Sequence, residues 1–317
     1  MAVKTKFLRQ DFENILSKYN IGEFVKSKPF TEGSVQTNVL IETTKGKFVF
    51  RYYETRPKKY ILFELDLLKH LGGKKFPSPV PIEDKSGNLL GTHNGKHYVF
   101  FSFLQGQHAG NPNTLPFKEQ SKEVAKIIAR LHKSTEGFKP NYYEVRDFYD
   151  PKCCVKTAKH FSKRSKSKKK MEQRLSWLKN ELKTLKLPNN LPKGVCHCDT
   201  HCSNFLFQKN TLTGLIDFDD ASYTWLIYDI ANMLYFWAWP PEKDLKFNKA
   251  KKLIKEYDKI RKLTATEKRH LFDVLKMVVF MSMSWFVYND EDYLNEKERI
   301  EYLDSLGRDG FYAMLFE

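Results

Sequence analysis

The sequence contains little glycine or proline and no long apolar run. Gly and Pro number 15 and 13 among 317 residues, which excludes collagen-like and low-complexity chains. The longest nearly uninterrupted apolar run, Met277–Tyr288, is too short to span a bilayer. Residues 1–16 lack the continuous apolar stretch of a secretory signal. We therefore expect a cytoplasmic protein without a membrane partner.

Cysteine is also scarce, and its pattern favours reduced thiols over disulfides. The five cysteines are odd in number, and no secretory signal accompanies them. Cys196–Cys202 reads CHCDTHC, so a zinc site has to be considered. Structural zinc usually pairs a C-x2-C knuckle with a second, distant pair of ligands. The spacing here is C-x-C-x3-C and the distant cysteines, Cys153 and Cys154, are adjacent, so we favour packing roles for Cys196 and Cys198.

The net charge of +16 is concentrated in one part of the chain. Residues 152–174 hold ten Lys or Arg against the single acid Glu172, and the rest of the chain carries only +7. A basic run of this kind is typical of a solvated face or loop. Attraction to nucleic acid, to an anionic substrate or to a membrane is the alternative, and we do not expect nucleic acid to be the main partner.

Length and composition predict two lobes of different kinds. The chain is about twice the usual length of one domain, and its hydrophobic share of 41% supplies a sizeable core. Strand patterns dominate the beginning of the chain and helical patterns the remainder. We predict an α+β, protein-kinase-like fold with a strand-rich lobe at residues 1–103 and a helical lobe at 104–317.

Hydrophobic periodicity locates the main elements of both lobes. Alternating or continuous apolar runs predict strands at Thr37–Thr43, Lys47–Tyr53, His97–Phe103, Asn204–Phe207 and Gly214–Phe218. Apolar residues at helical spacing, or long runs bounded by helix stops, predict helices at Lys58–Leu71, Lys118–Ser134, Lys170–Leu187 and Val274–Tyr288.

The pattern most informative about function is H-x-D-x4-N, followed by a hairpin and a hydrophobic-Asp-Phe segment. It comprises His197, Asp199 and Asn204, and then Asp217. Phosphoryl transfer needs a carboxylate that takes or orients the proton of the attacking hydroxyl, and hard oxygen ligands for Mg²⁺. Asp199 suits the first role. Asn204 and Asp217 suit the second, because a hairpin would return Asp217 to Asn204. We therefore predict that Asp199, Asn204 and Asp217 are catalytic and that the last two hold the metal.

With these motifs the chain resembles the aminoglycoside phosphotransferase/choline kinase superfamily of small-molecule kinases, and within it the type II homoserine kinases. The resemblance covers nearly the whole chain. It rests on MAVKT at the start, YNIGE at Tyr19–Glu23, Glu32-Gly33 with Asn38, Gly46–Glu54, Phe76–Pro81, Ile216–Phe218 and Tyr228–Ala231. It implies a kinase that uses ATP and Mg²⁺ to phosphorylate a hydroxyl group.

The resemblance implies a loop over the ATP phosphates and a hinge at the adenine. The loop spans Glu32–Thr37 and would bind phosphate through Glu32, Gly33, Ser34 and Thr37. The hinge would recognise adenine through the backbone of Ser102 and Leu104.

The resemblance also implies a basic residue on the third strand and its partner. Arg51 occupies the position of the base that contacts the phosphates, and Glu64 occupies the position of the helix glutamate that pairs with it. Arginine in place of lysine changes the geometry, because guanidinium is a planar fork. An exposed strand cation is the alternative for Arg51. Asp229 would order the catalytic loop by accepting hydrogen bonds, or would cap a helix.

Acidic and aromatic residues near the motif bear on the substrate. Asp219 and Asp220 suit a cationic substrate, with a role beside Mg²⁺ for Asp219 or plain turn positions as alternatives. Trp237, with Tyr235 and Trp239, could form a cage for a quaternary ammonium, or could simply pack a helix. Asp199 would contact the substrate hydroxyl.

The expected substrate is a small hydroxyl compound, L-homoserine first, giving O-phospho-L-homoserine. Choline, ethanolamine and aminoglycoside antibiotics are the alternatives within the same fold. Nucleic-acid binding by residues 152–174 and redox regulation through Cys198 remain alternatives of other classes.

Overall fold

The computed structural model describes residues 4–30, 35–109, 118–140, 151–240 and 244–317. The chain forms two compact units. The first comprises residues 1–106, 138–144 and 213–219, and the second comprises the remainder. Assignment of 1–103 and 104–317 to two functional lobes stays a proposal. No helix in the described ranges is both long and apolar enough to cross a bilayer.

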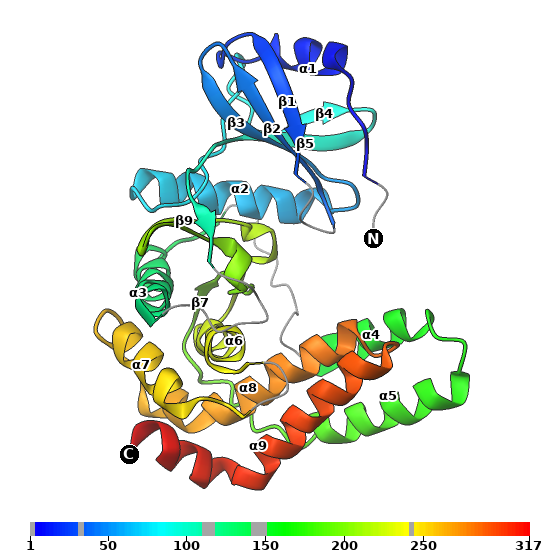
Figure 1. The fold of residues 1–317 in the computed structure, drawn as a ribbon, viewed down its shortest axis with the longest axis vertical. Helices are drawn as coiled ribbons and strands as arrows, with labels where there is room; N and C mark the ends of the chain where they lie inside the picture. The colour runs from blue at the N-terminus through cyan, green and yellow to red at the C-terminus, as the bar shows by residue number, and fades with distance from the viewer. Residues whose placement is uncertain (1–3, 31–34, 110–117, 141–150, 241–243) are drawn as a thin grey trace. The chain divides into compact units, whose positions relative to one another are not determined.

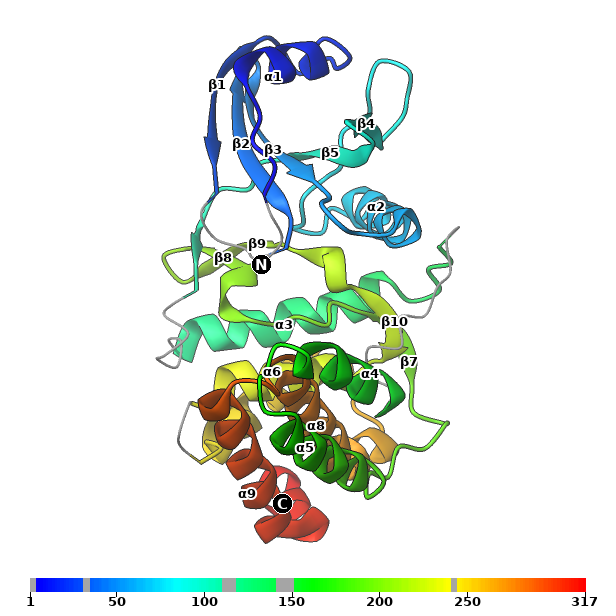
Figure 2. The same cartoon turned by 90° about the vertical axis from the view of Figure 1, so that its right-hand side faces the viewer.

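The first unit is built on a five-stranded antiparallel sheet (Figures 1 and 2). The strand order is β1-β2-β3-β5-β4, with bounds Phe24–Pro29, Thr37–Thr43, Gly46–Tyr52, Lys96–Ser102 and Gly91–His93. Strand β2 alternates buried and half-buried residues, the period expected of a sheet with one face on the core. Phe12 and Leu16 of helix α1 (Arg9–Leu16) pack with Phe50 and Phe100 of the sheet in one hydrophobic core. Helix α2 (Lys58–Gly73) completes this unit.

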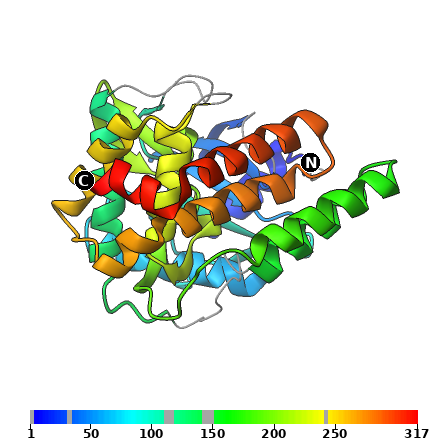
Figure 3. The ribbon, with the colours of Figure 1, turned by 90° about the horizontal axis from the view of Figure 1, so that it is seen from below.

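The second unit is mainly helical. Its helices are α3 (Lys118–Ser134), α4 (Pro151–Ser162), α5 (Lys168–Leu182), α6 (Ile227–Ala238), α7 (Phe247–Asp258), α8 (Ala265–Trp285) and α9 (Asp290–Phe316). Helix α8 packs against α4, α6 and α9 and forms the centre of the unit (Figures 1 and 3). It begins at Thr264, whose side chain and Glu267 form a capping box.

Short strands frame the H-x-D-x4-N motif. Strand β7 (Lys193–Cys196) pairs antiparallel with β10 (Ser222–Trp225), and β6 (Gln107–His108) pairs with β8 (Phe205–Gln208). The motif therefore lies between the end of β7 and the start of β8, with a 3₁₀ turn at Cys202–Asn204. Strand β9 (Thr211–Leu215) follows.

The predicted α+β fold is confirmed, and several predicted bounds match, including Thr37–Thr43 and Lys118–Ser134. Other bounds differ by one or two residues, and three differ by more. The helix expected at Val274–Tyr288 was wrong in its start, because Thr264 and Glu267 cap it before Ala265, and it ends at Trp285. The helix expected to reach Leu187 ends at Leu182, because the backbone N–H of Lys186 donates to Asp273 at 2.9 Å instead of to a helical carbonyl. The strand expected at Gly214–Phe218 ends at Leu215, two residues before Asp217 adopts a positive φ of 66°.

The basic segment at residues 152–174 lies on α4, α5 and their connection. All of its lysines, and Arg164, are exposed. Arg174 is the exception, since its side chain is buried and donates to Asp290 of α9 at 2.6 Å. Lys170 binds the same carboxylate at 2.8 Å. One end of the segment is therefore tied to α9, and much of the rest forms a solvated face.

Candidate active site

In the second unit, Asp199 and Asn204 are held together by direct hydrogen bonds. Nδ2 of Asn204 donates to Oδ2 of Asp199 at 2.8 Å and to its carbonyl oxygen at 3.0 Å. The backbone N–H of His201 donates to Oδ1 of Asp199 at 3.3 Å. These bonds fix the direction of the Asp199 carboxylate. They also use both N–H bonds of the Asn204 amide, so its carbonyl oxygen is the donor atom left to bind a cation.

Asp229 holds the backbone of the loop before Asp199 by accepting hydrogen bonds, as the resemblance implies. Its buried carboxylate lies in the first turn of α6 and accepts from the N–H of His197 and of Cys198, each at 2.8 Å. Asn232, one turn later, donates to the carbonyl of Cys198 at 2.7 Å. Cys198 has a φ of 73°, which is uncommon for a residue other than glycine. The two α6 side chains thus stabilise a strained bend directly before Asp199.

Two further buried side chains support this loop. His132 of α3 lies 3.0 Å from Asp229 through Nε2 and 2.6 Å from the hydroxyl of Tyr257 through Nδ1. Trp237 of α6 is completely buried and donates to the carbonyl of Thr200 at 2.8 Å. Sequence reasoning missed His132. The hint that the sequence offers is a histidine within a predicted amphipathic helix, close to the apolar residues of its buried face. Sequence reasoning placed Trp237 at the substrate, a role that stays a prediction.

The histidines and cysteines of Cys196–Cys202 do not assemble into a metal centre of their own. In the described ranges, the one group of three potential ligands within reach of a common ion is His132, Cys196 and Asp229. Of these only Cys196 belongs to the CHCDTHC segment. His132 and Asp229 already bond directly, and burial raises the pKa of the Cys196 thiol. The structure therefore gives no support to zinc in this segment.

In the first unit, Arg51 is the centre of a buried polar network. Its side chain is only 12% exposed, so the alternative of an exposed strand cation was wrong. Nη1 lies 3.1 Å from Glu64, Nη2 lies 2.9 Å from Asp217, and Nε donates to Asn38 at 3.0 Å. Burial alone would lower the pKa of Arg51, but the carboxylates of Asp217 and Glu64 raise it well above its usual value. The guanidinium fork thus joins three elements of the unit as a permanent cation.

Asp217 and Asp219 follow β9 and bind two different arginines. Asp217 has a positive φ of 66° and its side chain is 40% exposed. Asp219 lies 3.0 Å from Arg56, and both of these side chains are largely buried. Asp219 is therefore an ion-pair partner within the first unit rather than a solvated turn residue. Asp220, which begins the next segment of the second unit, is half-buried.

The structure describes only some of the other residues that were predicted to contact the nucleotide. Glu32, Gly33 and Ser34 lie outside the described residues. The backbone N–H of Ser102 already donates to Val80 at 2.9 Å, and Leu104, two residues after β5 ends, is half-buried. Asn204 and Asp217 belong to different units, so their joint metal site stays a prediction.

Glu54 is a buried carboxylate that sequence reasoning missed as an anchor. It accepts from the hydroxyl of Thr37 at 2.6 Å, from Lys96 at 2.6 Å and from the backbone N–H of Thr5 at 2.7 Å. Burial alone would raise the pKa of Glu54, but the hydrogen bonds from Lys96, Thr37 and Thr5 lower it to about 2. Thr37, predicted to face phosphate, is thereby bonded to Glu54. The only hint in the sequence was an acid at the end of an apolar strand.

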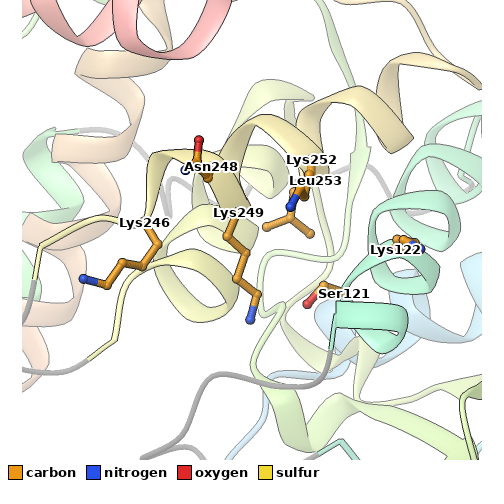
Figure 4. A pocket seen from close by; sticks show the side chains of 7 residues that line it. All are labelled: Ser121, Lys122, Lys246, Asn248, Lys249, Lys252 and Leu253. Atoms are coloured by element: carbon orange, nitrogen blue, oxygen red, sulfur yellow. The ribbon is translucent and has the colours of Figure 1, made fainter.

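The second unit also contains a basic pocket of about 390 Å³ between α3 and α7 (Figure 4). Its lining combines polar and cationic side chains, namely Ser121, Lys122, Lys246, Asn248, Lys249, Lys252 and Leu253. Burial lowers the pKa of Lys249 to about 8. The lining includes no carboxylate that could take a proton or bind a metal, so this pocket does not supply the phosphoryl-transfer residues.

Comparisons with known proteins agree on one family. Residues 26–263 match the family model described as the phosphotransferase enzyme family. A homoserine kinase of Rhizobium meliloti (strain 1021) is 28% identical over 315 residues, covering 96% of this chain and 94% of that protein. A homoserine kinase of Bartonella tribocorum is 29% identical and covers 96% of each.

Solved structures share the fold at lower identity. The amicoumacin kinase hAmiN, in complex with AMP-PNP, Ca²⁺ and its ligand, aligns with a TM-score of 0.70 and 18% identity over 95% of each chain. A microcompartment-associated aminopropanol kinase aligns with a TM-score of 0.62 and 16% identity, over 93% of this chain and 94% of that one.

Proposed function

This chain belongs to the phosphotransferase enzyme family and is a kinase of a hydroxyl group, and we propose that it phosphorylates L-homoserine with ATP to give O-phospho-L-homoserine. The observation that carries the chemistry is the Asp199 carboxylate, oriented by Asn204 and by the backbone of His201. The proposal of homoserine rests on similarity along 96% of the chain to homoserine kinases of several bacteria.

Asp199 would act on the acceptor. Its carboxylate takes the proton of the substrate hydroxyl as the oxygen attacks the γ-phosphorus, while the bond from phosphorus to the leaving oxygen of ADP breaks. The transfer is direct, so no phosphoenzyme forms. Catalysis of this kind depends mainly on positioning and on charge stabilisation. The hydrogen bonds from Asn204 and His201 keep the carboxylate in one orientation.

The residues predicted to hold Mg²⁺ have suitable chemistry. Both N–H bonds of Asn204 are directed at Asp199, which leaves its amide oxygen as a donor. Asp217 offers a carboxylate, and oxygen donors of these two kinds are those that Mg²⁺ prefers. We propose that Asn204 and Asp217 hold the ion. When bound, Mg²⁺ neutralises phosphate charge.

Arg51 would serve the phosphate donor. It stays charged at every physiological pH, because Asp217 and Glu64 raise its pKa further. A guanidinium suits phosphate oxygens as well as carboxylates. We propose that Arg51 contacts the ATP phosphates, with Glu64 fixing its position and Glu32, Gly33, Ser34 and Thr37 forming the covering loop. Ser102 and Leu104 would border the adenine.

A substrate panel tests this function. The purified protein is incubated with Mg²⁺-ATP and L-homoserine, choline, ethanolamine or several aminoglycosides, and ADP release is coupled to an optical signal. Phosphorus NMR of the product distinguishes a phosphate monoester from ATP hydrolysis. The proposal predicts saturable turnover with L-homoserine and a monoester product. Turnover with choline, ethanolamine or an aminoglycoside alone would retain the kinase and overturn the substrate.

A further inference from the structure

A cluster of charged and aromatic side chains joins α6, α8 and α9 inside the second unit. The hydroxyl of Tyr235 on α6 and that of Ser282 on α8 both hydrogen-bond Oε1 of Glu296 on α9. Arg299, three residues after Glu296, lies on the same face of α9. The four side chains form one connected group that the phosphoryl-transfer chemistry described above does not use.

Arg299 is a cation that packs on aromatic rings rather than in an ion pair. Its guanidinium lies 4.5 Å from the ring centroid of Tyr235 and 5.0 Å from that of Trp239. Nη1 is buried and has no hydrogen-bond partner, and no carboxylate in the described ranges forms an ion pair with it. Other arginines of the unit differ, since Arg174 binds Asp290 and Arg308 binds Asp273, each at 2.6 Å. The rings of Tyr235 and Trp239 therefore contact the Arg299 guanidinium, and the Glu296 carboxylate attracts it without forming an ion pair.

Glu296 has a buried carboxylate oxygen without a hydrogen-bond partner among the described residues, which complements the buried N–H group of Arg299. In the described structure, both of its hydrogen bonds reach Oε1, whereas Oε2 is buried and has no partner. Burial raises the pKa of the Glu296 carboxyl above its ordinary value. A buried carboxylate oxygen without a donor is costly, and a buried guanidinium N–H without an acceptor is costly too. One ligand that carries both an ammonium and a carboxylate would satisfy both atoms.

We propose that Glu296 and Arg299 recognise the α-ammonium and the α-carboxylate of an amino-acid substrate. The inference rests on the proposed function, because it assigns residues to the acceptor of that same reaction. Tyr235 and Trp239 hold the guanidinium by cation–π attraction. Tyr235 and Ser282 direct Oε1 of Glu296 away from the ligand, which leaves Oε2 for the ammonium.

The cluster lies close to the catalytic loop along α6. The Tyr235 ring packs edge-to-face on Phe236 at 4.9 Å, and Phe236 packs edge-to-face on His201 at 5.0 Å. His201 in turn donates its backbone N–H to Asp199. Helix α6 therefore carries the arginine's aromatic support and also borders the loop that presents the catalytic carboxylate.

The arrangement predicts which acceptors the enzyme prefers. Choline, ethanolamine and aminoglycosides carry cationic groups but no carboxylate, so they would leave Arg299 unpaired. A hydroxy acid without an amine would leave Glu296 unpaired. An unpaired buried charge opposes binding, so the pair selects zwitterions over amino alcohols.

The test compares two acceptors that differ only in the carboxylate, L-homoserine and 3-amino-1-propanol. For the wild type and Arg299→Met, kcat/KM is measured with each acceptor. We expect Arg299→Met to lower kcat/KM for homoserine roughly 10- to 100-fold, and to leave that for aminopropanol nearly unchanged. Arg164→Met is the matched control, because Arg164 also lies over two aromatic rings, those of Phe161 and Tyr288. It should leave both values unchanged.

Three outcomes separate the claims. Equal losses with both acceptors in Arg299→Met would overturn the inference and leave homoserine phosphorylation standing. Wild-type turnover of aminopropanol but not homoserine would overturn the proposed function and the inference together. Should Arg299→Met unfold, as circular dichroism would reveal, Arg299→Lys replaces it, since it keeps the charge and loses the fork. A selective loss with homoserine in that variant supports the inference, and no loss contradicts it.

Discussion

Nη2 of Arg51 donates to Oδ1 of Asp217 at 2.9 Å, although 166 positions separate the two residues in the chain. The same guanidinium binds Glu64 at 3.1 Å and Asn38 at 3.0 Å. The residue proposed to contact phosphate is therefore already joined to a residue proposed to hold the metal. The fork geometry of arginine is what allows three acceptors to be bound at once.

Arg51→Lys tests the importance of this fork. Lysine keeps the charge but cannot reach Asn38, Glu64 and Asp217 in one plane. We expect KM for ATP to rise roughly tenfold, with a smaller effect on KM for the acceptor. Steady-state kinetics with each substrate varied in turn provide the measurement. Unchanged kinetics in Arg51→Lys would show that the charge suffices, and Lys47→Arg on the exposed end of β3 serves as the control.

Asp229→Asn tests the support of the loop that carries Asp199, the proposed catalytic base. An amide in place of the carboxylate puts an N–H group against the backbone donors of His197 and Cys198. We expect a loss of stability of about 3 kcal/mol and a fall in kcat of roughly 100-fold. Thermal unfolding and kcat measured on the same preparation check both effects. A variant with native stability and turnover would contradict the assigned role, and Asp309→Asn, at an exposed position, controls for loss of charge.

Glu54→Gln tests how the contribution of Glu54 to the free energy of unfolding depends on pH. The pKa of Glu54 lies at about 2 in the folded protein, below the ordinary value of 4.5. Its ionised form therefore stabilises the fold above pH 4.5, and this contribution is lost as the pH falls from 4.5 towards 2. We expect Glu54→Gln to lower the free energy of unfolding by about 3 kcal/mol at pH 7 and by much less near pH 3.

Denaturant unfolding of both proteins at pH 7 and pH 3 measures that difference. Glu13→Gln, which removes an exposed i,i+4 pair with Arg9, should change stability little at either pH. A Glu54→Gln deficit that is equal at the two pH values would rule out the ionised carboxylate as its source.

The sequence predicted elements whose pattern is local. The alternation of Thr37–Thr43 and the helical spacing of Lys118–Ser134 gave their bounds directly. Asp199 and Asn204 are in contact. The H-x-D-x4-N spacing made this contact predictable, because only a short loop separates the two residues. The sequence carries no signal for the left-handed backbone conformation of Asp217, because that conformation is typical of glycine.

Contacts between distant helices could not be predicted in the same way. His132 meets Asp229 across 97 positions, and that meeting depends on how α3 packs against α6. Glu296 and Arg299 looked like ordinary charges of a polar helix. Only the packing of α9 in the folded unit buries one polar atom of each, Oε2 of Glu296 and Nη1 of Arg299, without a hydrogen-bond partner in the described ranges. Residues of this kind can be recognised only from the tertiary structure, which shows which charged groups are removed from solvent.

Trp237→Phe separates two roles for a residue that sequence reasoning assigned to the substrate. The variant loses the hydrogen bond to the carbonyl of Thr200, worth about 1 kcal/mol, but retains a buried ring. If the indole supports the loop, kcat falls several-fold while the relative kcat/KM for different acceptors stays constant. A change in the order of acceptor preference would instead place Trp237 at the substrate.

The most direct test of the account is the turnover of Asp199→Asn with L-homoserine and Mg²⁺-ATP, measured beside its affinity for ATP. The amide retains the size of the side chain but cannot take a proton. We expect kcat to fall roughly 10²- to 10⁴-fold while ATP binding and thermal stability stay close to those of the wild type. Near-native turnover in Asp199→Asn would contradict the assignment of the catalytic base.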